Sequence, residues 1–227
     1  MSRASRFLHD NSLTLVFGSA FLLTLVGEAA SGLADVNNQL VAADLQPVSV
    51  AGYLTGSDFA VDVTENWQSE YLQFFLYIFG TVWLLQRGSP ESKRLDQAGP
   101  ESDREQKVGR HATDDSPVWA RVSGLRRTLY SRSLGVVMAL FFLGSWIAQS
   151  ITGVSAFNAG RLRDLQAPLT WSDYVFSADF WNRTLQNWQS ELLAVASMAI
   201  LSVYLRQRGS PESKPVGAPH TATGVEG

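Results

Sequence analysis

Cysteine is absent from the 227-residue chain, and histidine is scarce, with only His9, His111 and His220. Without cysteine there is no disulfide, no thiolate metal site and no cysteine nucleophile. None of the histidines lies in an apolar stretch, which excludes a haem held between paired histidines of a helix bundle. The sequence also lacks an HExxH motif, a GxSxG motif with partner residues and a phosphate-binding P-loop. We therefore predict a protein that is not an enzyme and that holds no metal or cofactor.

Long apolar runs, in contrast, are plentiful. Four of them interrupt an otherwise polar chain, at Leu13–Ala30, Trp67–Gln86, Leu134–Thr152 and Trp188–Leu205. Each is close to the roughly 20 residues that an α-helix needs to cross a hydrocarbon core of about 30 Å. The alternative, buried helices of a soluble protein, leaves too little polar sequence to cover four such runs. For the first run a cleaved signal peptide is the alternative, because Arg3 and Arg6 precede it. We predict four membrane-spanning helices.

Positive charge is missing from one set of connections between these runs. The stretch from Ser31 to Asn66 has no lysine or arginine, and the corresponding later connection has only Arg161, Arg163 and Arg183. All other basic residues lie at the start of the chain, in the middle connection and in the tail. Basic residues favour the cytoplasmic side of a membrane. We therefore predict that both termini and the middle connection are cytoplasmic. The formal net charge of −3 does not indicate nucleic acid as a partner.

Two motifs, NWQSE and QRGSPESK, each occur twice in the chain. A shift of 121 residues takes Asn66 to Asn187, and the same shift superimposes both motifs without a gap. It also matches Gly32 with Gly153, Asn37 with Asn158, Tyr53 with Tyr174, and Phe59 with Phe180. Such self-similarity indicates a duplicated unit of helix, outer connection and helix. Because each copy has two spans, both copies begin on the same side. The predicted fold is all-α, a four-span transmembrane bundle of two tandem helix hairpins in parallel topology.

The predicted domains follow from this duplication. Residues 1–93 form the first two-helix repeat, and residues 118–214 form the second repeat with an amphipathic lead-in. Residues 94–117 and 215–227 are polar, which is typical of a disordered cytoplasmic linker and a disordered tail. The lead-in mixes Trp119, Leu125 and Leu129 with arginines. It is predicted to be a short helix on an anionic membrane surface, with nucleic-acid binding as the weaker alternative.

Residues that match between the two copies have predicted structural roles. The predicted interface anchors are Trp67, Trp188, Arg87 and Arg208, and the predicted helix caps are Gly88 and Gly209. Indole rings favour the headgroup level, basic side chains favour the C-terminal end of a helix, and glycine adopts the left-handed cap conformation. The Ser-Pro pair that follows each glycine then stops the helix. A phosphorylated Ser-Pro or a docking motif for a cytoplasmic protein is the alternative for this segment.

A layer of polar residues is predicted near the outer edge of the hydrocarbon. It consists of Glu28, Glu70, Gln149 and Glu191, with Asn66 and Asn187 one turn away on the same faces as the two later glutamates. Ionisable groups inside a span are costly unless they are paired or hydrated. One interpretation is structural, with carboxylates that reach outer water or are hydrogen-bonded and fix the helix register. The other is functional, a proton or cation site that opens outward.

Aromatic residues gather in the second outer connection, WSDYVFSADFWNR. They are predicted to form a belt at the outer membrane interface, because amphipathic rings prefer the headgroup level. A site that stacks rings on a ligand is the alternative.

Several of these motifs carry a resemblance to a known family. NSLTLVF, NWQSEYLQ, NWQSELLA and the two copies of QRGSPESK resemble an uncharacterised bacterial integral-membrane family, a domain of unknown function. The resemblance covers nearly the whole chain except residues 94–117, and it implies no reaction, ligand or protein partner. One departure from the family pattern is GSDFAVDVTE, which lacks the second aromatic residue of SADFWNRTLQ. It weakens the expectation that both outer rims bind the same thing.

These observations lead to one expectation about function and one alternative. The chain is expected to be a bacterial inner-membrane protein that acts as a non-enzymatic scaffold or accessory protein. The alternative is a small transporter or channel that uses the outer glutamate layer. The lipid bilayer is the expected partner, a homo-oligomer is left open, and nucleic acid is not expected.

Overall fold

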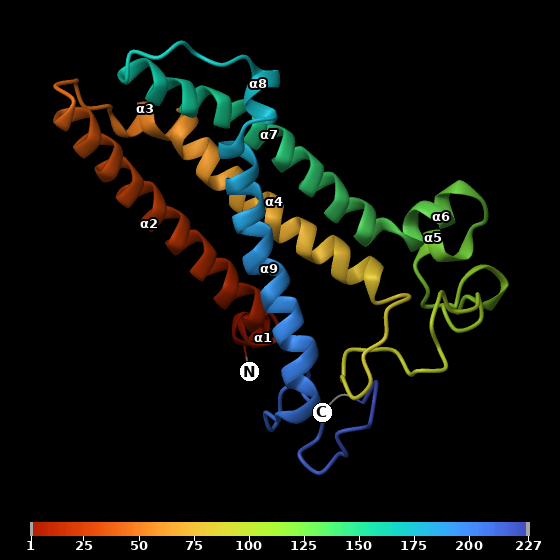
Figure 1. Ribbon diagram of the computed structural model, residues 1–227. Coiled ribbons are helices and arrows are strands. Elements are labelled where there is room, and N and C mark those ends of the chain that lie inside the picture. Colours follow the sequence, from red (N-terminus) through yellow and green to blue (C-terminus); the bar gives the residue numbers. More distant parts are fainter. Residues whose placement is uncertain (1, 226–227) are drawn as a thin grey trace. The chain divides into compact units, whose positions relative to one another are not determined.

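The computed structural model describes residues 2–225, and these residues form helices and turns without any strand (Figure 1). The α-helices are α1 (Arg3–Asp10), α2 (Ser12–Ala42), α3 (Val50–Leu54), α4 (Ser57–Gly80), α5 (Val118–Arg121), α6 (Leu125–Ser131), α7 (Ser133–Arg163), α8 (Trp171–Val175) and α9 (Ala178–Tyr204). One 3-10 helix, η1 (Gly109–His111), lies between α4 and α5. The all-α prediction is confirmed for this part of the chain.

The chain divides into two compact units, each of which is described by itself. Unit 1 consists of Met1–Val63 and Ile151–Trp171, and unit 2 consists of Thr64–Ser150 and Ser172–Gly227. Both units draw on both halves of the sequence, so their limits differ from the predicted repeat limits at residues 93, 117 and 214, which stay predictions. Met1 and the last two residues of the predicted tail, 226–227, lie outside the described residues.

Two helices are long and apolar enough to cross a membrane, namely α2 and α7, each of 31 residues. None of the most apolar window of α2 is buried, and only 17% of the corresponding window of α7 is buried. Neither helix contains proline, which explains the unbroken length, and each has only two charged residues, Glu28 and Asp35 in α2 and Arg161 and Arg163 in α7. In contrast, α4 and α9 begin with charged turns, so their apolar parts are shorter. Two of the four predicted spans therefore have helices of sufficient length and composition.

Both long helices end in the same way. The residue after the cap, Asp44 in one case and Leu165 in the other, adopts a left-handed conformation with φ of 57°. In both, the next amide donates to a carbonyl five residues back, at 2.8 Å. This is the Schellman arrangement, which satisfies carbonyls at a helix end. Glycine normally occupies the left-handed position. Aspartate tolerates it, but leucine is uncommon there, and the Leu165 side chain is 95% exposed.

An asparagine then holds the chain that follows each long helix. The Asn37 side chain accepts from the Val48 amide at 2.7 Å and donates to the Val48 carbonyl at 3.1 Å. The Asn158 side chain makes the same pair of bonds with Leu169, at 2.8 and 2.9 Å. A primary amide can donate and accept at once, so one side chain satisfies both polar groups of a distant residue. The extended segment before the next short helix is fixed by this pair of bonds.

A tyrosine follows each of these turns in the sequence and is buried in its own unit. In unit 1, Tyr53 is 3% exposed and its ring centroid lies 5.6 Å from that of Phe59. A Cβ atom on Gly32 would lie 2.0 Å from the Tyr53 hydroxyl oxygen, so this position of α2 requires glycine. In unit 2, Tyr174 is 1% exposed and also lies 5.6 Å from a phenylalanine ring, that of Phe180. Tyr174 and Phe180 are therefore buried inside unit 2, whereas Phe176 of the same segment is 85% exposed, and the aromatic belt at the outer membrane interface stays a prediction.

The QRGSPESK segments form turns in unit 2. In the first copy the Ser92 hydroxyl accepts from the Gln86 amide at 2.9 Å, and in the second the Ser213 hydroxyl accepts from the Gln207 amide at 2.9 Å. Both turns lie beyond the helices, since α4 ends at Gly80 and α9 at Tyr204. The second apolar run was expected to be helical to Gln86, which the structure corrects.

The residues after the second copy fold back onto the first copy. Lys214 is 1% exposed, and its ammonium group donates to the Gly88 carbonyl at 2.5 Å and to the His220 carbonyl at 2.9 Å. It also lies 3.3 Å from the carbonyl oxygens of Pro219 and Ala222. These bonds join the turn after α4 to the segment that follows α9.

Candidate functional site

The interior of unit 2 contains fully buried polar side chains. Gln68, Gln149 and Thr184 are each 0% exposed, and Ser69 is 1% exposed. They come from three helices, α4, α7 and α9. Buried polar groups are normally hydrogen-bonded, because an unpaired one costs free energy. This group of residues is therefore the most informative feature of the unit, and we call it the buried polar cluster.

A single indole links two of these helices. The Trp188 Nε1 group of α9 donates to the Gln68 carbonyl oxygen of α4 at 2.7 Å. Both residues belong to copies of the NWQSE motif, but Trp188 is the second position of one copy and Gln68 is the third position of the other. The tryptophan of the second copy, Trp188, points inward, whereas its counterpart in the first copy, Trp67, is 38% exposed. The glutamine that corresponds to Gln68 is Gln189, which is exposed. The two copies thus meet asymmetrically.

Aromatic rings pack beside this link. The ring of Trp146 on α7 lies 5.7 Å from Trp188, 5.6 Å from Phe142 and 6.4 Å from Phe180, measured between centroids. Trp181 meets the same ring edge-on at 6.1 Å. Tilted, offset and edge-on arrangements are the favourable ones for aromatic pairs. The rings hold α7 against α9 and bring Gln149, one turn further along α7 than Trp146, to the same part of the unit.

Several atoms of the buried polar cluster and of the adjacent Trp146 have no hydrogen-bond partner among the described residues. They are the Gln68 Nε2, the Gln149 Nε2 and Oε1, the Thr184 Oγ1 and the Trp146 Nε1 atoms. Leaving a buried donor or acceptor unpaired costs about 1–3 kcal/mol. These atoms offer amide, hydroxyl and indole donors and one amide acceptor. This combination is suited to neutral hydrogen-bonding groups. Within residues 2–225 no group of three histidine, aspartate or glutamate side chains is arranged to hold a metal ion.

A charged network lies next to the cluster, one turn away along α4 and α9. Arg183 Nη1 is 3.2 Å from the Glu65 carboxylate, and its Nε is 3.5 Å from the Asp179 carboxylate. The Tyr174 hydroxyl donates to Asp179 at 3.4 Å. Burial, and then the negative charge of Asp179, raises the pKa of the Tyr174 phenol to about 12. This hydroxyl therefore stays protonated and serves as a donor throughout the physiological range.

The predicted polar layer is only partly brought together. Gln149 is fully buried, Glu191 is half-buried and Glu70 is exposed. Glu70 and Glu191 lie within electrostatic range of each other, and neither carboxylate has a hydrogen bond or ion pair among the described residues. Glu28 belongs to unit 1, where its charge acts on Tyr53.

The flanking asparagines of this layer behave differently. Asn187 donates from its side chain to the Arg183 carbonyl at 3.0 Å, so it supports the charged network. Asn66 is exposed, and its backbone carbonyl accepts from the Ser69 hydroxyl at 2.9 Å. The two matched residues thus occupy different environments, and they do not form one symmetric polar ring.

The predicted anchors and caps also occupy different environments. Arg87 and Arg208 are exposed, and Trp67 is partly exposed, whereas Trp188 packs inside unit 2 because its indole has a buried acceptor. The predicted caps are Gly88 and Gly209, which have φ of 86° and 81°. They lie in the turns after α4 and α9 and do not cap the helices directly, because both helices end earlier.

Sequence reasoning missed Gln68, Thr184, Glu65 and Arg183. The periodicity of an apolar run shows that a face exists, but not which face meets a neighbour. The repeated NWQSE motif was a usable signal for Gln68, because a motif kept twice in a chain marks a constrained position. Arg183 was the only basic residue in its part of the second outer connection, and that isolation was a signal for a carboxylate partner.

Comparison with known families decides the wider assignment. The family described as Domain of unknown function (DUF6766) matches residues 4–225. The chain belongs to this family. No curated protein and no solved structure matches the chain. Membership of DUF6766 covers both copies of NWQSE and of QRGSPESK, as well as the buried polar cluster. It brings no reaction, ligand or partner to these residues.

Proposed function

We propose that this DUF6766 protein is a multi-pass protein of a bacterial inner membrane, with four spans in two tandem hairpins and with both termini in the cytoplasm. The observation that carries the proposal is α2, a 31-residue apolar helix whose most apolar window is entirely exposed. An exposed apolar surface of this kind is stable against lipid or against another apolar surface. The similar helix α7 makes a second span of the same kind.

The hairpin arrangement is supported by details that recur at a shift of 121 residues. The long helices have equal length, their ends have the same left-handed residue, and the Asn37 and Asn158 bonds are the same pair. The apolar parts of α4 and α9 supply the second span of each hairpin. The orientation is supported by the scarcity of basic residues in the two outer connections.

Single-cysteine labelling tests this topology directly, because the natural chain has no cysteine to remove. Ala43→Cys lies at the exposed end of α2, and Asp115→Cys lies in the exposed middle connection. In intact cells a membrane-impermeant maleimide is expected to label Ala43→Cys. It is expected to label Asp115→Cys only after the inner membrane is opened. Labelling of Asp115→Cys in intact cells would contradict the proposed orientation.

Within the membrane, the role that we infer is that of a non-enzymatic scaffold or accessory protein. The exposed side chains of α2 support it, for example Phe17 at 68% and Leu23 at 74% exposure. Such a face is available to a second copy or to another membrane protein. A photoreactive residue in place of Phe17 is expected to form a discrete adduct with a protein, including a differently tagged second copy. Adducts with lipid alone would contradict a scaffold role for this face.

A small transporter or channel is the second candidate. It is supported by the carboxylates of Glu70 and Glu191, which lie within electrostatic range and have no described partner. If they carry a proton or a cation, Glu70→Gln combined with Glu191→Gln abolishes ion or proton flux in liposomes. Flux that is unchanged by the double substitution, or flux that is absent from the natural protein, removes this candidate.

A further inference from the structure

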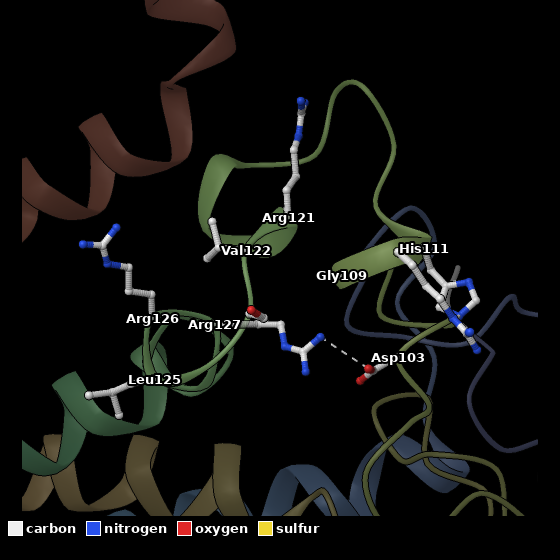
Figure 2. Close-up of a pocket in the computed structure, with 10 residues that line it drawn as sticks. Asp103, Gly109, His111, Arg121, Val122, Leu125, Arg126 and Arg127 are labelled. Atoms are coloured by element: carbon white, nitrogen blue, oxygen red, sulfur yellow. Dashed lines mark hydrogen bonds and ion pairs between the residues drawn. The ribbon is translucent and has the colours of Figure 1, made fainter.

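An open cavity of about 1010 Å³ lies among η1, α5 and α6, outside the long apolar helices. Its lining includes four arginines, Arg110, Arg121, Arg126 and Arg127, and one carboxylate, that of Asp103. In Figure 2, Arg127 reaches toward Asp103, whereas Arg121 and Arg126 extend away from it. The other acidic residues nearby in the sequence, Glu101, Glu105, Asp114 and Asp115, do not line the cavity.

The single carboxylate leaves most of this positive charge uncompensated. Arg127 reaches toward Asp103 (Figure 2), but the distance between the Arg127 Nη1 and the carboxylate oxygen is 3.4 Å and the aspartate side chain is 65% exposed. A long, exposed ion pair of this kind contributes little and is easily exchanged for a better one. Arg121 donates to the backbone carbonyls of Ser116 and Asp114, which fixes the side chain without neutralising it.

One arginine of the cavity is not engaged. Arg126 is exposed and has no hydrogen bond or ion pair within residues 2–225, and its side chain extends from the start of α6 (Figure 2). A guanidinium group offers donors in a planar fork that suits two oxygens of one phosphate. Arg126 and Arg127 both line the cavity, and their side chains extend in different directions from α6 (Figure 2).

Apolar side chains surround the same short helices. Val118 is 71% exposed, Trp119 50%, Leu125 73% and Leu129 48%. The next helix, α7, begins at Ser133, directly after α6 ends at Ser131. If α7 enters the membrane as proposed above, the cavity lies at the cytoplasmic surface of the bilayer, where the exposed apolar side chains contact acyl chains.

We propose that this cavity binds the phosphate-bearing headgroup of an anionic membrane lipid, with Arg126 and Arg127 as its phosphate ligands and with the apolar side chains of α5 and α6 against the acyl region. This inference rests on the proposed membrane location. Charge favours an anion over a zwitterion, since basic residues near an anionic membrane surface each add to binding. The apolar rim favours a lipid over a free phosphate ion, which has no acyl chain to bury. The volume matches the upper end of the roughly 300–1,000 Å³ of ligand sites.

The experiment uses the full chain purified in detergent and native mass spectrometry to count retained lipids. Phosphatidylglycerol, phosphatidylethanolamine and inorganic phosphate are the probes. The natural protein is expected to retain phosphatidylglycerol in preference to phosphatidylethanolamine, and an equal concentration of inorganic phosphate is expected not to displace it. In Arg126→Gln/Arg127→Gln the affinity for phosphatidylglycerol is expected to fall about thirty-fold, because each arginine near an anionic surface contributes roughly fivefold.

The matched control is Arg161→Gln/Arg163→Gln, a pair of arginines at the far end of α7. It is expected to retain phosphatidylglycerol like the natural protein. Arg126→Gln alone, which breaks no described bond, keeps the test valid if the double variant does not fold, and an affinity loss of about fivefold is expected for it.

Equal retention of phosphatidylglycerol by the natural protein and the arginine variants would overturn the proposal. Displacement by inorganic phosphate would overturn it too, since the site would then be one for free anions. Failure of the membrane orientation is seen separately, as Asp115→Cys labelling in intact cells. The two experiments therefore distinguish failure of the lipid site with an intact topology from failure of the topology itself.

Discussion

The two copies of NWQSE have the same five residues and different surroundings. In α4 the glutamine is buried and the tryptophan is exposed, whereas in α9 the tryptophan is half-buried and the glutamine is exposed. The inward tryptophan of the second copy donates to the inward glutamine of the first. A repeated motif therefore supplies two complementary groups, a donor from one copy and an acceptor from the other. Identical sequence does not give identical burial, because each helix rotates to face its own neighbours.

The largest effect that separates the copies is expected at the tryptophans. Trp188→Ala removes an indole that contacts Trp146 and Phe142 and leaves the Gln68 carbonyl without its donor. We expect the free energy of unfolding to fall by about 3 kcal/mol, the lower end for tryptophan-to-alanine changes in a packed interior, because the ring is half-buried. Trp67→Ala, the matched change in the first copy, is expected to cost about 1 kcal/mol or less, since this ring is partly exposed.

Chemical unfolding of both variants in detergent, followed by circular dichroism, gives the comparison. Equal losses from Trp188→Ala and Trp67→Ala would show that the two motif copies are equivalent in solution, and the asymmetric packing would then be wrong.

A second contrast concerns the lysines that close the two QRGSPESK segments. Lys214 is buried against four backbone carbonyls, whereas Lys93 is partly exposed, donates to the Gly99 carbonyl at 2.8 Å and pairs with the Glu101 carboxylate. Lys214→Met is expected to lower the local opening free energy around Gly88 by about 3 kcal/mol, because bonds to a charged donor are lost. Lys93→Met is expected to cost about 1 kcal/mol, as for other exposed pairs.

Hydrogen exchange of the Gly88 and Gly224 amides measures this contrast, because both amides are bonded across the fold-back, to Thr223 Oγ1 and to the Ser89 carbonyl. Protection of both amides that survives Lys214→Met would contradict the role given to this lysine.

Substitutions of the two left-handed residues, Asp44 after α2 and Leu165 after α7, are expected to change stability by smaller amounts and in opposite directions. Leu165→Asn is expected to stabilise the end of α7 by about 1 kcal/mol, because asparagine tolerates the left-handed conformation better than leucine does. Asp44→Leu is expected to destabilise the end of α2 by a similar amount. Thermal unfolding of the two variants provides the measurement. A loss of stability on Leu165→Asn would mean that the exposed leucine makes a contact that the isolated chain does not have.

The smallest expected effect is a pH dependence of the fold-back. Burial, and then a hydrogen bond with the Glu212 carboxyl group, raises the pKa of Glu91 from 4.5 to about 7, and the Tyr77 hydroxyl donates to the same carboxylate. A raised carboxyl pKa means that the folded state favours the protonated form. The contribution of Glu91 to the stability of the folded state is therefore complete below about pH 4.5 and is lost as the pH rises through about 7.

Exchange protection of the Gly224 amide, corrected for the intrinsic pH dependence of exchange, is expected to fall progressively as the pH rises from about 4.5 through about 7. Glu91→Gln should flatten this profile. Glu105→Gln is the control, because the Glu105 carboxylate is fully exposed and its pKa is lowered by bonds to Ser102, so the profile should not change. A flat profile in the natural protein would contradict the pairing of Glu91 with Glu212.

The sequence was sufficient for the features that depend on local composition. The apolar runs predicted α2 and α7, and the repeat predicted that Asn37 and Asn158 occupy matched places. Features that depend on distant partners were not predictable. The helix α4 ends at Gly80 although its apolar run continues, and there the Val82 carbonyl accepts at 2.7 Å from the amide of Gly99, a residue of the middle connection. Nothing in the sequence of the apolar run indicates that Gly99 is the partner of Val82.

The same limit explains the buried polar cluster. Glu70 and Glu191 were noticed because a charge in an apolar run is conspicuous, whereas Gln68 and Thr184 are ordinary residues whose burial depends on how α4 and α9 are rotated. The sequence thus indicated Gln149, which belongs to the buried polar cluster, but it did not indicate Gln68 or Thr184.

The fold-back held by Lys214 has a consequence for the order of biosynthesis. The turn around Gly88 emerges from the ribosome long before its ammonium donor does, so that turn waits in an incomplete state while the second half of the chain is made. A fusion or truncation close behind residue 214 would prolong this state and expose the loop to proteases. A reporter placed there needs a spacer that leaves residues 214–225 free to dock.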